Sequence, residues 1–437
     1  MRNSPLISAP MVWLLLGILS AASMEYYVAE IWSSGQPAHF SDLYAPWWGA
    51  HELLLHGRNP YSPEVAHEIQ NVIYGASVNS TAEDPLGIGG GFAYPPHAAL
   101  LLWPTIHMSF PAAQGVFISI SILATLLSVA LWLRALRFPW SPLIWLTVAL
   151  FTVGSFPALQ GIKLENLSLI AAAFIAITVS LLAADHLVLS GIFLAVSTFK
   201  PQFTIALIPW LAIWTLSDWR RRRLLAWSFL TTMLLLVLFS RWLVPGWISS
   251  FLHIIRAYRR YTYGHSLLDV WFTPTWGPWI GASLLLLTLA FSWRHRSQSA
   301  DSAQFLSTVS LLLAVTLVVI PTLAPHAQLL LLPGFLCLLR DRSLLRSSGP
   351  LARTFLAAAW ALLAWPWIAA LGMLLAAVQF STPALLRFWE VPLYTSPLLP
   401  FAVATALGCF VRARQTFRPS PPAPCFGEGL KPTDSEG

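Results

Sequence analysis

The stretch AAQGVFISISILATLLSVALWL, residues 112–133, decides the fold class. It runs for 22 residues without a charged side chain and ends directly before Arg134. About 20 apolar residues in a helix cross the hydrocarbon core of a bilayer, where the backbone must satisfy its own polar groups. This stretch therefore predicts a transmembrane helix.

Comparable apolar stretches fill most of the remaining chain. Of the 437 residues, 57% are hydrophobic and only 10% are charged, against about 25% charged residues in soluble domains. Mean hydropathy is +0.66. Such a composition excludes a disordered chain and argues against a soluble multidomain enzyme. We expect an all-α polytopic membrane protein with about eleven to thirteen transmembrane or re-entrant helices. Residues 187–216 should break at Lys200-Pro201, and residues 93–108 are short for a span.

The basic residues predict the orientation. Of 25, all but three are Arg, and they form short clusters between apolar runs, which is the positive-inside pattern and not a nucleic-acid surface. We expect a multi-pass protein of a bacterial plasma membrane with a cytoplasmic N-terminus. The clusters expected in the cytoplasm are Arg220–Arg223, Arg294 and Arg296, Arg340 and Arg342, and Arg412 and Arg414. Arg134 and Arg137 join them only if residues 93–108 do not cross.

These assignments divide the chain into a polytopic domain over residues 1–414 and a Pro-, Ser- and Gly-rich tail over 415–437, which is expected to be disordered. Residues 24–92 form a long first outer loop, and residues 245–273 form a second. The first loop holds eight of the 18 acids and one basic residue, Arg58. Its mixed apolar and polar content predicts amphipathic helices at the membrane surface.

Neither a cofactor nor a metal site is predicted. No G-x-G-x-x-G, H-E-x-x-H or D-x-D motif occurs, and the three cysteines have no C-x-x-C spacing. His51, Glu52 and His56 are too loosely spaced in sequence to be called ligands.

Three sequence motifs resemble, in their order, the motifs of a known protein family. Asp42-Leu43-Tyr44 comes first, then Leu53 to Tyr61 (LLLHGRNPY), then Tyr94-Pro95-Pro96 opening an apolar segment that ends at Trp103-Pro104. In order and spacing they resemble the family-87 glycosyltransferases, which are membrane enzymes of the GT-C superfamily. Weaker similarities follow in residues 191–209, which contain Lys200, and in residues 264–268. Where that family tends to carry Gly-Gln before a helix, this chain has Leu164-Glu165-Asn166.

The resemblance implies a GT-C-like fold and transfer of a hexose, mannose in the best-known relatives, from a polyprenyl-phosphate donor. Transfer would take place on the non-cytoplasmic face with inversion, onto a lipid or glycan acceptor. Such a reaction needs a base for the acceptor hydroxyl and cationic stabilisation of the departing phosphate. Asp42 occupies the position of the family's early Asp and is the predicted base, with Glu52 as the runner-up and a further substrate-site residue.

Lys200 is the leading candidate for the phosphate, because an ionisable residue within an apolar run is costly and marks a functional site by default. Snorkelling to the interface is the alternative. Residues 247–263 form a basic amphipathic segment whose Arg256, Arg259 and Arg260 suit either substrate phosphate or anionic headgroups. His265 and Tyr94 complete the predicted substrate site, and His326 is interpreted as structural.

A transporter or flippase for a lipid-linked sugar is the alternative function. It predicts repeated halves with matching broken helices, whereas the sequence shows one clear break, at Lys200-Pro201. A scaffold without chemistry is a third interpretation, in which Lys200 and the acidic loop have no catalytic role.

Overall fold

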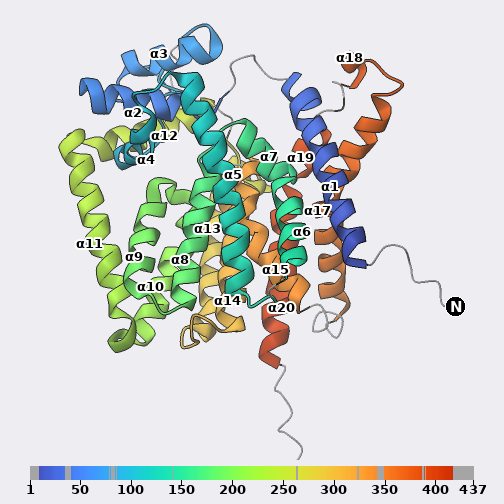
Figure 1. Ribbon diagram of the computed structural model, residues 1–437. Coiled ribbons are helices and arrows are strands. Elements are labelled where there is room, and N and C mark those ends of the chain that lie inside the picture. Colours follow the sequence, from blue (N-terminus) through green and yellow to red (C-terminus); the bar gives the residue numbers. More distant parts are fainter. Residues whose placement is uncertain are drawn as a thin grey trace, which may run out of the picture.

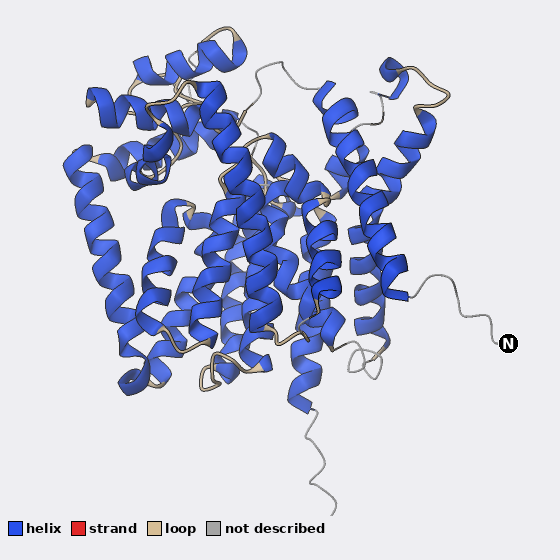
Figure 2. Ribbon diagram, viewed as in Figure 1, coloured by secondary structure: helices blue, strands red, loops and turns tan. Residues whose placement is uncertain are grey.

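The computed structural model describes residues 9–34, 41–77, 79, 84, 86–139, 141–261, 264–321, 324–341, 349–385, 388 and 390–416. Within this part of the chain every regular element is a helix (Figures 1 and 2). The all-α polytopic prediction is confirmed. The tail predicted over residues 415–437 lies outside the described residues apart from its start.

Among the described residues, six helices are long and apolar enough to cross a membrane. They correspond to α1 (Ala9–Tyr26) with the π-helical turn η1 (Tyr27–Trp32), α5 (Phe110–Ala135), α11 (Trp219–Leu243), α13 (Leu267–Ser292) with η6 (Trp293–His295), α17 (Pro350–Ala376), and α19 (Val391–Thr395) with α20 (Leu398–Thr416). Because α1 and η1 continue to Trp32, the first outer loop begins later than the predicted residue 24.

Other predicted spans are bent or short. α6 (Pro142–Val153) and α7 (Phe156–Lys163) meet at 60° and pass the same test only as a pair. The shorter apolar helices are α8 (Ser168–Ala183), α9 (Leu187–Val196), α10 (Leu207–Ser217) and α14 (Ala303–Val319). A 3₁₀ segment, η7 (Pro325–Leu331), leads into α15 (Leu332–Arg340). The prediction of eleven to thirteen helices thus counted several that are too short to span alone.

The predicted break at Lys200-Pro201 is present. The 3₁₀ turns η4 (Ser197–Phe199) and η5 (Pro201–Thr204) separate α9 from α10, and Lys200 between them has φ −117° and ψ 77°. Proline lacks an N–H and disfavours the helical conformation of the preceding residue. The helical path is therefore interrupted at Lys200, between α9 and α10.

At one end of the bundle lies a group of short helices that we call the cap (Figure 1). It comprises α2 (Tyr44–His56), α3 (Pro63–Tyr74), α4 (Ala99–Leu102), α12 (Trp247–Tyr261), and the turns η2 (Pro96–Ala98) and η3 (Trp103–Thr105). α4 packs on α2. Residues 93–108 therefore belong to the cap and do not cross. A further short helix, α18 (Thr382–Leu385), follows α17.

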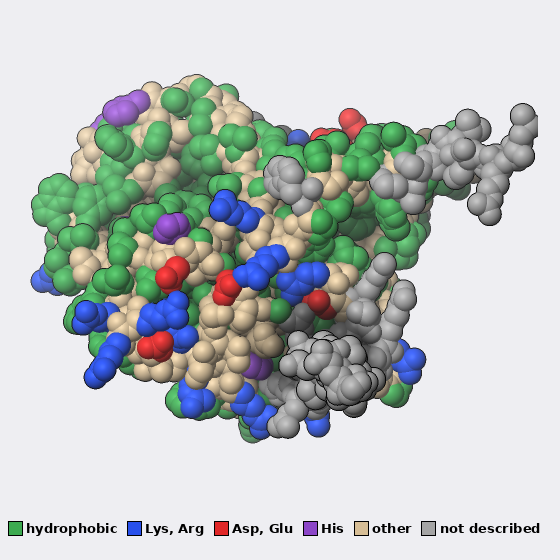
Figure 3. Space-filling view, turned by 60° about the horizontal axis from the view of Figure 1, so that its bottom comes forward, with side chains coloured by type: hydrophobic (Ala, Val, Ile, Leu, Met, Phe, Trp, Pro, Cys, Tyr) green, Lys and Arg blue, Asp and Glu red, His purple; other side chains and the backbone are tan. Residues whose placement is uncertain are grey.

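The arginine clusters meet at the opposite end. Arg340 donates to the Leu136 carbonyl at 2.7 Å, and Arg137 pairs with Asp301. Arg222 donates to the Arg296 carbonyl at 2.8 Å. Lys and Arg side chains are spread over the face that Figure 3 turns forward. Because residues 93–108 stay in the cap, Arg134 and Arg137 fall at this end, and the conflict in the predicted orientation disappears.

Candidate active site

Asp42 is held where the cap meets the membrane bundle. It lies two residues before the start of α2, and its backbone N–H donates to the Leu164 carbonyl at the end of α7, at 2.9 Å. The side-chain amide of Asn166 donates to Asp42 Oδ2 at 2.6 Å. Oδ1 has no hydrogen-bond partner among the described residues, which leaves this oxygen available to an incoming group.

Asn166 also binds Lys200. The ammonium Nζ donates to Asn166 Oδ1 at 2.8 Å and to Ser168 Oγ at 2.7 Å. The N–H of Ser168 donates to the same Asn166 oxygen at 2.8 Å. One amide thus bridges Asp42 and Lys200, which are 158 positions apart in sequence. Lys200 is only 6% exposed, so it does not snorkel to the surface of the protein.

A second carboxylate, Glu165, lies beside this chain of contacts. Its φ of 52° turns the backbone sharply between α7 and α8. The Ser41 hydroxyl and the Gln114 amide both donate to its carboxylate, the latter at 3.1 Å. Glu165 is buried and its acceptors are occupied. It therefore fixes the segment next to Asp42 and is less accessible to a substrate.

Tyr94, one of the predicted substrate-site residues, lies beside Lys200. Its ring centroid lies 5.7 Å from Nζ, the same distance as that of Phe203. The Tyr61 hydroxyl donates to the Tyr94 carbonyl at 2.5 Å and so ties two of the motifs together. Aromatic faces attract an ammonium group at this separation. Tyr94 therefore forms one wall around Lys200.

The predicted amphipathic helix is α12, and it covers this wall. Tyr258 of α12 lies near Tyr94. Ile254 is fully buried and packs toward Gly91, where an added Cβ would meet its Cδ1 at 3.3 Å. A second row of apolar side chains stays exposed: Ile248, Leu252 and Ile255. α12 thus packs one face on the cap and presents another outward, as a helix at a membrane interface does.

The basic residues of this region differ in their partners. Arg259 donates to Asp269 Oδ2 at 3.2 Å and to the Gly264 carbonyl at 3.1 Å. Arg256 is exposed and has no hydrogen-bond or ion-pair partner in the described part of the chain. The side chain of Arg260 lies outside the described residues. His265 precedes α13, and its buried Nδ1 has no partner among the described residues. Arg256 and His265 are the members of this group left open to a ligand.

Glu52, the alternative base, belongs to a different site. It lies more than two turns along α2 from Asp42, and Arg58 donates to its Oε2 at 2.6 Å. His51 and His56 flank its other oxygen. A carboxylate already paired in this way is a poor base for an acceptor hydroxyl at Asp42.

The surroundings of Asp42 shift its acidity. Burial raises the pKa of this carboxyl above its ordinary value, while the Asn166 hydrogen bond and the positive charge of Lys200 act in the opposite direction. Burial disfavours the charged form, and a hydrogen bond to the carboxylate favours it. The balance gives a carboxylate with more proton affinity than an exposed Asp, as a general base requires.

Several site residues were not found by sequence reasoning. Asn166 and Glu165 were noted only as a departure from the family pattern, and Ser168 and Gln114 were not singled out. Their one signal is position, since they are polar residues at the ends of apolar stretches. His326, interpreted as structural, lies near Lys200, and its backbone N–H donates to Gln160 Oε1 at 3.2 Å.

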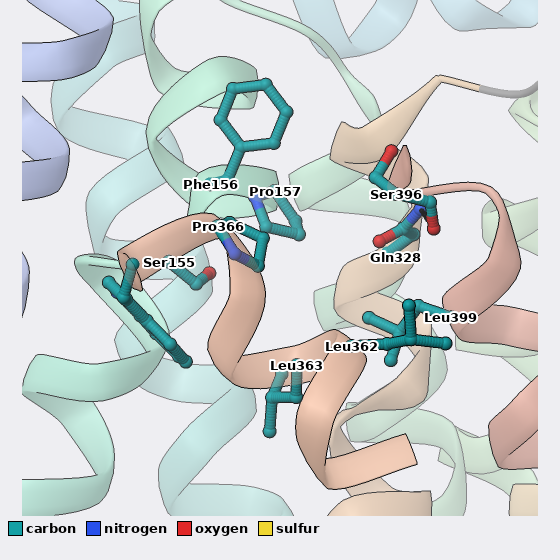
Figure 4. A pocket seen from close by; sticks show the side chains of 10 residues that line it. Ser155, Phe156, Pro157, Gln328, Leu362, Leu363, Pro366, Ser396 and Leu399 are labelled. Atoms are coloured by element: carbon teal, nitrogen blue, oxygen red, sulfur yellow. Dashed lines mark hydrogen bonds between the residues drawn. The ribbon is translucent and has the colours of Figure 1, made fainter. Parts of the chain in front are cut away.

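One pocket lies apart from these residues. Side chains from α7, η7, α17 and the start of α20 line it (Figure 4). Its polar members are Ser155, Gln328 and Ser396, and the amide of Gln328 donates to the Ser396 carbonyl at 3.0 Å. None of the predicted site residues lines this pocket, so the pocket is not part of the candidate active site.

Comparison with known proteins agrees with the motifs. The model of glycosyltransferase family 87 matches residues 92–321, more than half of the chain. The match includes Tyr94, Asn166, Lys200 and α12, and it begins after Asp42 and Glu52. No curated protein and no solved structure matches the chain. The chain therefore belongs to glycosyltransferase family 87 and is a membrane glycosyltransferase.

Proposed function

We propose that this glycosyltransferase transfers a hexose from a polyprenyl-phosphate donor to a lipid or glycan acceptor, with mannose as the first candidate sugar. The reaction takes place on the non-cytoplasmic face and inverts the anomeric carbon. The observation that carries the proposal is the chain of contacts from Asp42 through Asn166 to Lys200. It sets a carboxylate and a cation side by side at the junction of cap and bundle, where a lipid-borne donor enters from the bilayer.

Asp42 acts as the general base. The acceptor hydroxyl oxygen attacks the anomeric carbon, the bond from that carbon to the phosphate oxygen breaks, and the hydroxyl proton passes to Asp42 Oδ1. The electron pair of the broken bond leaves with the polyprenyl phosphate. Asn166 supports this role because its amide occupies Oδ2 and so orients the carboxylate.

Lys200 stabilises the reaction electrostatically. Two of its three ammonium protons are bonded to Asn166 and Ser168, and the third is directed to the phosphate as negative charge develops there. Arg256 and His265 contribute at the rim, where α12 lies at the interface. Arg259, which is paired with Asp269, instead holds α12 to the start of α13.

The direct test is transfer by purified protein in lipid nanodiscs. Radiolabelled polyprenyl-phosphate mannose and polyprenyl-phosphate glucose are each offered with a panel of glycolipid and glycan acceptors. We expect transfer from one donor that depends on Asp42, and a product of inverted anomeric configuration. Failure of every pair beside an active control enzyme would overturn the proposed donor.

Sidedness is tested separately. A cysteine placed at Asp42 in intact cells should react with a membrane-impermeant maleimide from the non-cytoplasmic side. Labelling only after the cells are opened would contradict the proposed face.

A further inference from the structure

We propose that His51, Glu52 and His56 bind a divalent transition-metal ion of the zinc class on the cap. His51 Nδ1 lies 3.0 Å from Glu52 Oε1, and His56 Nε2 lies 3.9 Å from the same oxygen. The ligand atoms of all three residues fall within 4.8 Å of one another. The sequence spacing alone gave no reason to group them.

These separations suit a tetrahedral site. Bonds of about 2.0–2.1 Å from zinc to imidazole nitrogen or carboxylate oxygen put neighbouring ligand atoms roughly 3.3 Å apart. Only small side-chain rotations are needed to bring the three atoms to that spacing. Two imidazoles with one carboxylate form a ligand set that zinc accepts and that magnesium and calcium, which prefer oxygen, do not favour.

Local structure explains how the cluster arises. Glu52 and His56 are four residues apart and share one face of α2. His56 is the last residue of the helix, and Gly57 ends it with a φ of 63°. The N–H of Gly57 bonds to the Glu52 carbonyl. The i,i+4 spacing thus places His56 beside Glu52, and the helix ends directly after it.

Neighbouring side chains orient the three residues. Arg58 occupies Glu52 Oε2 at 2.6 Å, which leaves Oε1 facing the imidazoles. Arg58 also pairs with Glu68 at 2.7 Å, and Glu68 accepts a hydrogen bond from Trp48 Nε1 at 2.9 Å. The Trp48 ring stacks on His51 with centroids 5.0 Å apart and planes at 7°. Such outer partners fix the orientation of metal ligands.

Exposure leaves room for further ligands. The Glu52 side chain is 4% exposed, that of His51 20% and that of His56 55%. The site therefore opens to solvent at His56, where water completes the coordination. From Asp42 to His51 the chain runs mostly along α2, a rise of roughly 13 Å at 1.5 Å per residue. The ion accordingly steadies the end of α2 and takes no part in the transfer step.

The test uses the full-length protein purified through a tag that contains no histidine. The protein is incubated with Zn²⁺, passed through a metal-free desalting column, and its zinc content is measured by mass spectrometry. We expect about one zinc per chain in the wild type, and a loss of most of it in H56A and E52Q. His67 is the matched control, since it lies in the neighbouring α3 outside the cluster, and H67A should retain the zinc.

Cobalt provides a readout that reports ligand geometry. Co²⁺ bound to the wild type should give the intense visible absorption of a tetrahedral site, bleached by Zn²⁺ and absent in H56A. Because His56 is exposed, H56A is expected to fold, and its elution on size exclusion checks this. Zinc content equal in wild type and H56A, or lost equally in H67A, would overturn the proposal, as would a Co²⁺ spectrum unchanged by H56A.

Discussion

Lys200 and Arg222 are both 6% exposed, yet their surroundings differ. Arg222 donates to the carbonyls of Trp214, Arg296 and Gln298 and to the Ser217 hydroxyl, and its guanidinium lies 3.8 Å from the Trp214 ring centroid. It ties the ends of three helical segments together at the arginine-rich end. Lys200 has two side-chain acceptors, and through Asn166 it reaches a carboxylate. Equal burial therefore accompanies a structural cation at Arg222 and, in the proposed mechanism, a cation that stabilises the departing phosphate at Lys200.

The strongest test asks whether the carboxylate beside Lys200 does chemistry. Asp42→Asn should lower the transfer rate about 10²–10⁴-fold, the usual contribution of a general base. Thermal stability should change little, because the amide replaces the carboxylate at nearly equal volume. Glu64→Gln, at an exposed acid of the same cap, is the control and should keep wild-type activity. Transfer retained in Asp42→Asn would show that the carboxylate beside Lys200 is not the base.

The next test replaces each of the two cations with methionine. Lys200→Met should reduce kcat on the order of 10²-fold, because it removes charge stabilisation made in the transition state. Arg222→Met should remove the hydrogen bonds that a charged guanidinium donates to three carbonyls, each of which contributes about 1.5–3 kcal/mol, and so lower the melting temperature. The folded fraction of Arg222→Met should keep its kcat. Parallel losses of stability and of kcat in both variants would show that the two cations have the same role.

A smaller effect is expected at the bridging amide. Asn166→Ala removes the hydrogen bond to Asp42, and a hydrogen bond to a charged group contributes about 1.5–3 kcal/mol, or roughly 10–100-fold in rate. Ser168→Ala removes an acceptor of Lys200 only, and should cost less. Initial-rate kinetics at saturating donor distinguish the two. A larger loss in Ser168→Ala would place the important contact at Lys200 and not at Asp42.

The smallest effect is a shift in pH dependence. The base works when deprotonated, so kcat/KM should fall as the pH drops through the pKa of Asp42. Because burial raises that pKa, the acidic limb should lie above the range of an ordinary Asp. Lys200→Met removes the charge that lowers this pKa and should move the limb to still higher pH. A pH–rate profile of both proteins checks the sign, and a shift to lower pH would contradict it.

Much of the fold was predictable because its causes are local. Residues 112–133 lie within α5, and the break at Lys200-Pro201 follows from the geometry that proline imposes. The course of residues 93–108 was not predictable, since a short apolar stretch fits a membrane or a packed cap equally well. The packing of α4 against α2 places these residues in the cap.

Some residues of the candidate site were likewise predictable from sequence, and others were not. Asp42 and Lys200 were singled out from sequence, the first by resemblance and the second because a lysine in an apolar run is costly. Asn166 was missed because its role depends on a contact across 124 positions. The His51, Glu52 and His56 cluster was missed because the closeness of its ligand atoms depends on side chains held by Arg58 and Trp48.

The sequence by itself determined the membrane class, the place of the central break and the residue types available for transfer. These follow from hydropathy, proline geometry and charge, which act over a few neighbouring residues. Only the tertiary structure decided which polar groups meet. A buried polar group needs a hydrogen-bond partner, and in this protein the packing of distant helices supplies Asn166 to both Asp42 and Lys200.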